Sequence, residues 1–226
     1  MTLSAGTAAR SGSTAPGTEE DPLDLAALAS TPVSTDPFPH VIVPGFLKPD
    51  ALVAIERDFP AIDRPGSFPP EALRFGPAFA DMLNALEAPP LARAIEDKFG
   101  VDLAGRPTMV TVRGMTRQKD GQIHTDSTDK LITALLYMNG AWEADGGRLR
   151  LLRSADGLDD YAAEVPPVAG TLLAFVNGPT AWHGHKPFAG RRRTIQLNWV
   201  TDGGVVARER RRHGLSATLK RLNPFG

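Results

Sequence analysis

The residues best suited to metal chemistry begin with the motif IHTDS, Ile123 to Ser127. On a strand, residues two apart point to the same face, so His124 and Asp126 would aim an imidazole and a carboxylate at one point. A solvent-exposed turn rich in aspartate and serine accounts for the same residues without a metal. The motif therefore needs a further ligand nearby before it predicts a site.

His183, in the later motif WHGH, is the candidate for that further ligand. It follows an apolar run and sits in a turn with Gly184, a position from which its side chain could reach across the mouth of a barrel. His185 is the rival ligand, and a purely structural role is the alternative for His183. Two histidines and one carboxylate form a facial triad, which leaves neighbouring positions of an octahedral ion open and suits non-haem iron(II). Zinc could use the same ligands less distinctively.

Arg193 is the candidate for binding an acidic small molecule beside the metal. In RTIQLNWV (193–200), alternation places Arg193 on the apolar face of a strand with Leu197 and Trp199, and we predict that this face points inward. A buried guanidinium without a partner is costly, and no acid shares that face. A bound dicarboxylate would supply the counter-ion, because a guanidinium binds a carboxylate through two hydrogen bonds. The alternatives are an arginine that reaches the rim or one that pairs with a distant acid.

Tyr137 is the candidate for a second contact to the same carboxylate. It ends the run LITALLY (131–137), in which both faces are apolar, as is typical of a strand covered on both sides. Tyr137 shares a face with Thr133 and Leu135. If that face lines the interior of a barrel, its hydroxyl can reach the carboxylate bound by Arg193. A core aromatic without a functional role is the alternative.

The elements that must position these residues are helices first and strands afterwards. Apolar periodicity predicts helices at about residues 51–59, 79–86 and 90–100. From Pro107 onward, short β-rich runs are separated by Gly, Asp, Asn and Pro, which predicts a series of short strands. This order indicates an α+β fold with helices on one face of a largely antiparallel sheet structure. A barrel or jelly roll is the natural way to close that many short strands.

The chain divides into three predicted parts. Residues 1–34 are rich in small residues and are expected to form a disordered tail, although residues 21–29 could form a short helical turn. Residues 35–204 form the expected domain, with helical support at about 48–100 and the barrel at about 105–201. Residues 205–226 form a basic C-terminal extension, which we interpret as a solvated helix or tail rather than a patch that binds a partner.

The composition narrows the classes of function. The 226-residue chain has a formal net charge of −1 and no cysteine, which excludes disulfides, thiolate nucleophiles and sulfur-ligated metals. No global field attracts nucleic acid. No segment approaches the roughly 18 consecutive apolar residues of a membrane helix, and the first twenty residues lack the apolar stretch of a secretory signal. We therefore expect a cytoplasmic protein with neither a membrane span nor a nucleic-acid partner; its oligomeric state is open.

Between residues 110 and 200 the chain resembles the iron- and 2-oxoglutarate-dependent dioxygenases of the prolyl 4-hydroxylase-like group. The ordered set of motifs is far more specific than any single one. The motifs are HTD (124–126), LLYMNGAW (135–142), DGGRLRLL (145–152), PVAGTLLAFVN (167–177), WHG (182–184) and RRTIQLNW (192–199). The resemblance implies a double-stranded β-helix, a jelly-roll (cupin-like) barrel with supporting N-terminal helices.

The resemblance also implies a role for each candidate residue. By match to the family's motifs, His124, Asp126 and His183 are the iron ligands, Arg193 binds the distal carboxylate of 2-oxoglutarate, and Tyr137 assists it. The cofactor and co-substrates implied are Fe(II), 2-oxoglutarate and O2, with ascorbate as a candidate addition.

Two further motif positions match less closely. Gly146 and Gly147 match a tight turn between barrel strands, and Arg113 lies near a position that often faces the co-substrate.

The implied reaction is hydroxylation of a C–H bond with release of succinate and CO2. Halogenating relatives replace the carboxylate at the position of Asp126 with a small residue, so its presence favours hydroxylation. A non-catalytic barrel that senses a metal or small acid is the main alternative, and a zinc-dependent hydrolase or isomerase is another. The substrate, small molecule or peptidyl, is open. The polar loop 118–122 is either a lid that contributes to specificity or a solvated turn.

Overall fold

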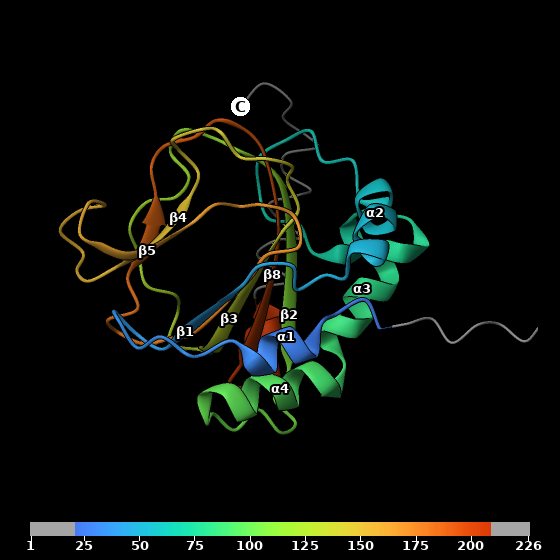
Figure 1. Ribbon diagram of the computed structural model, residues 1–226, viewed down its shortest axis with the longest axis horizontal. Coiled ribbons are helices and arrows are strands. Elements are labelled where there is room, and N and C mark those ends of the chain that lie inside the picture. The colour runs from blue at the N-terminus through green and yellow to red at the C-terminus, as the bar shows by residue number, and fades with distance from the viewer. Residues whose placement is uncertain (1–20, 209–226) are drawn as a thin grey trace, which may run out of the picture.

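Two antiparallel sheets form the centre of the molecule (Figure 1). The protein is described here from a computed structural model, which covers residues 21–208. The strands are β1 (His40–Val43), β2 (Thr108–Thr116), β3 (Lys130–Tyr137), β4 (Leu149–Leu152), β5 (Tyr161–Val165), β6 (Leu172–Val176), β7 (His183–His185) and β8 (Gly190–Val200). One sheet has the order β1-β6-β3-β8-β2 and the other β5-β4-β7. The predicted combination of helices with antiparallel sheets is confirmed.

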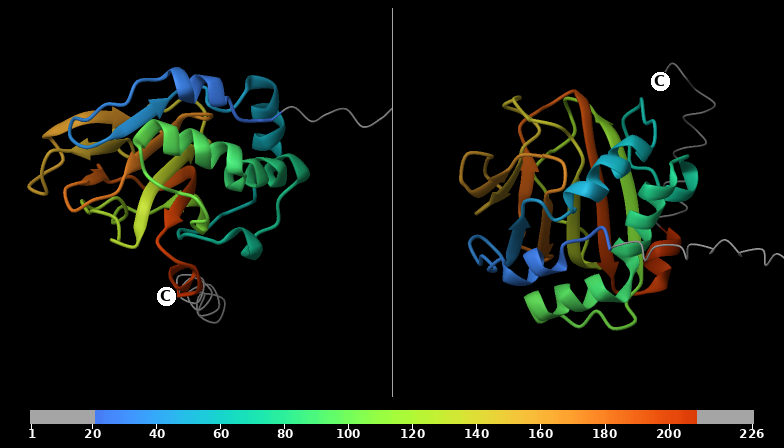
Figure 2. Two further views of the ribbon diagram at one scale, coloured as in Figure 1. Left: turned by 90° about the horizontal axis from the view of Figure 1, so that it is seen from below. Right: turned by 45° about the vertical axis from the view of Figure 1, so that its right-hand side comes forward.

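The helices cover one face of the five-stranded sheet (Figure 2). They are α1 (Leu25–Ser30), α2 (Pro49–Asp58), α3 (Pro77–Glu87) and α4 (Pro89–Phe99), with a 3-10 turn η1 (Pro70–Ala72). Apolar side chains of α3 and α4 such as Phe79 and Ile95 are fully buried in one core with Leu197 and Trp199 of β8. Gly100 ends α4 in the left-handed region, with φ +66°, which a glycine adopts without strain.

The opposite face of the five-stranded sheet meets the three-stranded sheet. Tyr137 of β3 and Phe175 of β6 pack there against Leu151 of β4 and Val165 of β5. Alternate residues of each central strand therefore belong to two different cores, because side chains alternate between the faces of a strand. This explains why the run 131–137 is apolar on both faces.

The register of the central strands aligns polar side chains on the face toward the small sheet. Strand β3 pairs with β8 so that Thr133 lies opposite Asn198 and Tyr137 opposite Thr194. On its other side β8 pairs with β2, where Arg113 lies opposite Thr194. Directly opposed residues of an antiparallel pair project to the same face. The space between the sheets is thus bordered by polar groups from three adjacent strands.

The N-terminal boundary of the domain differs from the prediction. Residues 21–34 were assigned to a disordered tail, and this is wrong, because they form α1 and pack on the domain. Asp24 caps α1 by accepting a hydrogen bond from the backbone N–H of Ala27 at 2.8 Å, and Leu28 is fully buried. The buried leucines of this segment, which is otherwise rich in small residues, pack it against the main core.

The two ends of the chain fall outside the described residues. These are residues 1–20 of the predicted tail and residues 209–226 of the predicted C-terminal extension. Within the described part, no helix has the length and apolar character needed to span a membrane. The cytoplasmic location expected from the sequence stays a prediction.

Candidate active site

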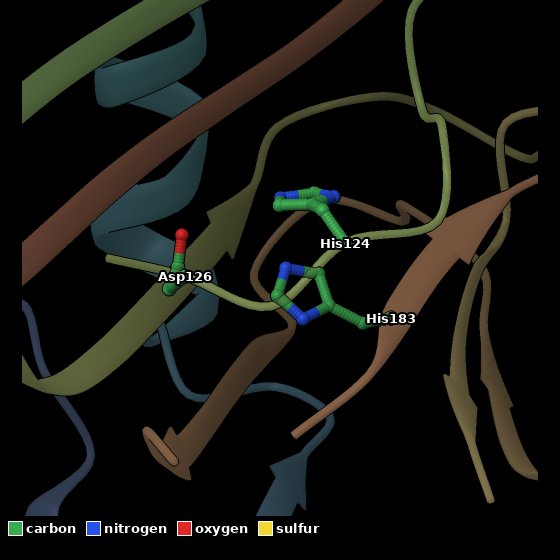
Figure 3. A group of neighbouring side chains, drawn as sticks. All are labelled: His124, Asp126 and His183. Atoms are coloured by element: carbon green, nitrogen blue, oxygen red, sulfur yellow. The ribbon is translucent and has the colours of Figure 1, made fainter. Parts of the chain in front are cut away.

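His124, Asp126 and His183 form a compact cluster between the two sheets (Figure 3). One ligand atom from each side chain lies within 4.8 Å of the others. His124 and Asp126 come from the segment that joins β2 to β3, whereas His183 opens β7 in the small sheet. The sequence analysis named these three residues together, and the structure brings them together.

A backbone pairing between two distant segments holds the histidines side by side. The N–H of His124 donates to the carbonyl of His183 at 3.0 Å, and the N–H of His183 donates back at 2.9 Å. Residues that exchange both hydrogen bonds in this way project their side chains to the same face. The ring centres are accordingly only 4.3 Å apart.

Both imidazoles are oriented through Nδ1. The carbonyl of Gln122 lies 2.8 Å from Nδ1 of His124, and the carbonyl of Ala181 lies 2.9 Å from Nδ1 of His183. A carbonyl only accepts hydrogen bonds, so each Nδ1 carries the proton and each Nε2 is left as a lone-pair donor for a metal. Burial, together with nearby His124, lowers the pKa of His183 to about 4, which keeps it neutral at pH 7.

Asp126 is held as a carboxylate by two neighbours on β3. Lys130 Nζ donates to Oδ1 at 2.7 Å, and Thr133 Oγ1 donates to Oδ2 at 2.5 Å. Burial opposes ionisation, but the charge of Lys130 and these hydrogen bonds outweigh it, so the pKa of Asp126 lies below its ordinary value. A neutral imidazole at His183 and an anionic carboxylate at Asp126 are the protonation states that metal coordination requires.

Asn198 and Gln196 continue this support on β8. Asn198 Nδ2 donates to Thr133 Oγ1 at 2.8 Å, and Gln196 Nε2 donates to Asn198 Oδ1 at 3.1 Å. The chain of donors runs from Gln196 to Asp126 and fixes the carboxylate in one orientation. Sequence reasoning missed these residues. The sequence did contain a signal for them. Gln196 and Asn198 lie on one face of a strand, and a polar face on a strand that is covered on both sides indicates a polar cavity.

His185 is not part of the metal cluster, although it lines the same pocket. Its Nδ1 lies 2.8 Å from the carbonyl of Lys186, and its backbone N–H donates to Gly121 at 2.9 Å. A side chain at Gly121, which has φ +84°, would collide with the imidazole. The loop before His124 is therefore packed against His185, and of the two rivals it is His183 that joins the cluster.

Arg193 lies on the face of β8 opposite to the pocket. Its guanidinium carbon sits 4.7 Å from the centre of the Phe59 ring, beside α2. The prediction that the apolar face of this strand points into the barrel is wrong, because that face packs against the helices. Asn139 fixes this orientation, since its side chain accepts from the N–H of Arg193 at 2.6 Å and donates to its carbonyl at 3.0 Å.

Arg192, one position earlier, is the arginine that enters the pocket. It is 6% exposed, and burial lowers its pKa. Its Nε donates to the carbonyl of Gly147 at 2.7 Å, and Nη1 donates to Thr194 Oγ1 at 3.3 Å. Gly147 has φ +79°, so glycine is needed for the turn that aims this carbonyl. Among residues 21–208, no acid forms a salt bridge with Arg192.

Tyr137 is fully buried next to Arg192. The guanidinium carbon lies 5.4 Å from the centre of the tyrosine ring. Within residues 21–208 the hydroxyl of Tyr137 makes no hydrogen bond of good geometry, and burial raises its pKa, although the charge of Arg192 and a weak side-chain contact with it oppose that effect. An unpaired buried hydroxyl beside an unpaired buried cation is costly unless a ligand satisfies both.

The metal cluster borders a pocket of about 300 Å³. The metal cluster, Arg192 and Arg113 line it, together with residues 119–122 of the polar loop. A hollow of about 370 Å³ lies between η1, α3 and the start of β2, but no residue of the metal cluster borders it. The chemistry therefore belongs to the smaller pocket.

A model of a known protein family matches part of the chain. Residues 111–201 match the 2OG-Fe(II) oxygenase superfamily. This confirms the resemblance seen in the motifs, and with it the class of enzyme, a 2-oxoglutarate-dependent iron oxygenase. Fe(II), 2-oxoglutarate and O2 are the cofactor and co-substrates of that class. No curated protein matches the chain.

Solved structures show the same fold. A prolyl-4-hydroxylase from Pseudomonas putida is 23% identical and has a TM-score of 0.50, with 78% of this chain and 90% of that chain covered. A prolyl 4-hydroxylase structure from Phytophthora capsici is 16% identical with a TM-score of 0.53, covering 84% of this chain and 70% of that chain. At these identities the likeness concerns the fold.

Proposed function

We propose that this protein is an Fe(II)- and 2-oxoglutarate-dependent hydroxylase in which Arg192 and Tyr137 bind the distal carboxylate of 2-oxoglutarate. The proposed iron ligands are His124, Asp126 and His183. We also infer that the two sheets are the two halves of a double-stranded β-helix, a jelly-roll barrel whose interior is this pocket.

The observation that carries this proposal is the unpaired guanidinium of Arg192 in the same pocket as the metal cluster. A buried cation without an acid is destabilising by several kcal/mol in order of magnitude. A dicarboxylate supplies one carboxylate for a metal and one for this guanidinium. The free hydroxyl of Tyr137 then gains an acceptor as well. One ligand would thus bind the metal and satisfy the two side chains, Arg192 and Tyr137, that lack a partner among the described residues.

Each residue has a defined task in this arrangement. The histidines offer Nε2, because Nδ1 of each is held by a backbone carbonyl. Asp126 contributes one negative charge to the metal, and Thr133 keeps its carboxylate in place. Arg192 orients the co-substrate with the donors that Gly147 and Thr194 do not occupy. Apolar neighbours such as Leu135 and Leu149 restrict water in the pocket.

Bound iron would supply O2 activation coupled to decarboxylation of 2-oxoglutarate, with succinate and CO2 as products. The protein's own contribution is to leave coordination positions open, since it offers only three ligands. Asp126 also bears on the outcome, because a carboxylate at this position occupies the site that halogenating relatives leave for halide. Hydroxylation of a C–H bond is therefore the proposed reaction.

The test compares two adjacent arginines. Arg192→Gln should weaken 2-oxoglutarate binding by about 10- to 100-fold, the effect of losing hydrogen bonds to a charged group in a buried site. Arg193→Gln, on the other face of the strand, should change the affinity by less than about twofold. Binding is measured by calorimetry on the Mn(II)-loaded protein, and succinate formation is measured with Fe(II) in air.

Two results would contradict the proposal. Equal effects of Arg192→Gln and Arg193→Gln would remove Arg192 from the co-substrate site. Binding of 2-oxoglutarate without any Fe(II)- and O2-dependent succinate would favour the rival, a non-catalytic barrel that senses a metal or small acid.

A further inference from the structure

Arg113 is a second unpaired arginine in the pocket, and neither the metal cluster nor the proposed anchor uses it. It lies on β2 opposite Thr194 and lines the pocket together with His124 and His185. Within residues 21–208 it forms no salt bridge and no hydrogen bond of its side chain. Burial lowers its pKa, so its charge is disfavoured where it stands.

Asp120 and Asp126 are the acids whose charges act on the pKa of Arg113, and both already have other partners. Asp120 forms a salt bridge with Arg117 at 3.2 Å and accepts from its backbone N–H at 2.9 Å. Asp126 is bound by Lys130 and Thr133. Arg117 itself disfavours the charge of Arg113. The described chain therefore leaves no free acid for this guanidinium.

With metal and co-substrate bound, positive charge in the site is left without a counter-ion, and Arg113 carries part of it. The two charges of Fe(II) are balanced by Asp126 and by one carboxylate of 2-oxoglutarate, and the other carboxylate balances Arg192. Lys130 adds positive charge rather than negative. A further anion is needed, and metal and co-substrate do not provide it.

We infer that the substrate supplies this anion, and that it is a small carboxylic acid whose carboxylate is bound by Arg113. The inference rests on the proposed function and names the substrate class for the same site. A guanidinium binds a planar carboxylate through two parallel hydrogen bonds, which also fixes the direction in which the rest of the substrate extends.

The size and lining of the pocket agree with this class. A volume of about 300 Å³ lies at the lower end of the range for ligand sites and must hold 2-oxoglutarate as well. Gln122 and Gln196 line the same pocket and offer neutral donors and acceptors near Arg113. A small polar acid fits these conditions better than a bulky or apolar substrate.

The experiment measures binding of simple acids and their amides to the loaded protein. The full chain is saturated with Mn(II) and 2-oxoglutarate, so that the acids do not occupy Arg192. It is then titrated calorimetrically with propionate, benzoate and L-proline and with propionamide, benzamide and L-prolinamide. We expect saturable binding of at least one acid, and binding of its amide that is weaker by about tenfold or more.

Variants separate Arg113 from the rest of the site. Arg113→Gln should weaken binding of that acid by about 10- to 100-fold and leave the affinity for 2-oxoglutarate within about twofold. Arg191→Gln, an exposed arginine on β8, is the matched control and should change neither affinity. The apo Arg113→Gln protein should unfold at a temperature no lower than the wild type, because a half-buried cation without an acid partner has been removed.

Four results would overturn the inference. They are no binding of any of the acids to the loaded wild type, equal binding of acids and amides, unchanged acid binding in Arg113→Gln, and a loss of about tenfold or more in 2-oxoglutarate affinity in that variant. The last result would place Arg113 in the co-substrate site. Failure of the proposed function looks different, because the metal-loaded wild type would then not bind 2-oxoglutarate at all.

Discussion

The two faces of strand β8 in the five-stranded sheet are both largely buried but differ in chemistry. Toward the helices, β8 presents Leu197 and Trp199 to a continuous apolar core. Toward the small sheet, the same strand presents Arg192 and Asn198, with exposures of 6% and 1%. Burial alone therefore does not distinguish the core from the cavity in this protein. The polar face marks the cavity.

The two faces also differ in what they contribute to stability. Each large apolar side chain buried under the helices stabilises the fold by about 1.5–3 kcal/mol. The pocket face instead holds a guanidinium without an acid and a hydroxyl without a partner, Arg192 and Tyr137. Such exceptions are expected where a ligand completes the structure. One face stabilises the domain, and the other retains unsatisfied groups for binding.

The largest effect is expected from the metal cluster on the pocket side. His183→Ala should reduce Fe(II)-dependent succinate formation by about 1,000-fold or more, as removal of a residue essential to a catalytic unit does. His185→Ala, two residues on, should retain stoichiometric metal. Metal content after dialysis and the succinate rate are measured on both. The assignment fails if His185→Ala loses the metal and His183→Ala keeps it.

On the helix side, the largest effect is on stability. Trp199→Ala should lower the free energy of unfolding by about 3–5 kcal/mol, because it leaves a cavity in the main core. Gln196→Ala, which faces the pocket, should lower it by about 1 kcal/mol, the contribution of one hydrogen bond. Urea unfolding of the apo variants measures both. Similar losses would mean that the two faces do not differ as proposed.

Much of the pocket could be predicted from the sequence because its residues are tied to local patterns. His124 and Asp126 are two apart, and the pairing of His124 with His183 needs only that both segments are extended. Tyr137 lies on the face shared with Thr133, as alternation requires. These positions depend on spacing within short segments, and spacing is visible in a sequence.

The orientation of β8 could not be predicted in the same way. Alternation separates Arg192 from Arg193 but does not say which face meets the helices and which the cavity. The prediction equated apolar with interior, whereas the pocket that this strand borders is lined largely by polar residues. Asn139, which binds the backbone of Arg193 from a distant segment, fixes the choice. Contacts of that kind have no local signal in the sequence.

The pH dependence of stability should also come from the pocket side. Burial, with the charge of Arg192 nearby, lowers the pKa of His185 to about 4 in the folded protein, against 6.5 for the ordinary side chain. Between these values the unfolded chain binds a proton that the folded chain does not, so stability falls as the pH falls from about 6.5 toward 4. The contribution of His185 should be about 2 kcal/mol between pH 7 and pH 5.

The variant His185→Gln isolates that contribution. Urea unfolding of the apo protein at pH 7 and pH 5 should show a smaller loss of stability in His185→Gln than in the wild type. Asp126 does not interfere, because its pKa lies below its ordinary value and its contribution is lost only at more acidic pH. Equal losses in the two proteins would show that His185 is not the titrating group.

The smallest effect is expected on metal affinity, from the hydroxyl of Thr133 on the pocket face. Thr133→Val keeps the shape of the side chain but removes the donor to Asp126 Oδ2 and the acceptor for Asn198. Residues that orient a metal ligand contribute about 10- to 100-fold to metal affinity, and we expect the lower end, because Lys130 still holds Oδ1.

The matched control is Thr108→Val, whose hydroxyl donates to Glu87 at 2.8 Å at the far end of β2. This variant should leave Mn(II) affinity unchanged, because Thr108 lies outside the pocket. Competition with a chelator measures the affinity of both variants. If Thr133→Val binds the metal as tightly as Thr108→Val does, the chain of donors from β8 does not act on the metal. The hydrogen bonds of Thr133 and Asn198 would then stabilise only the fold, because their effect on Asp126 would not change the binding of the metal.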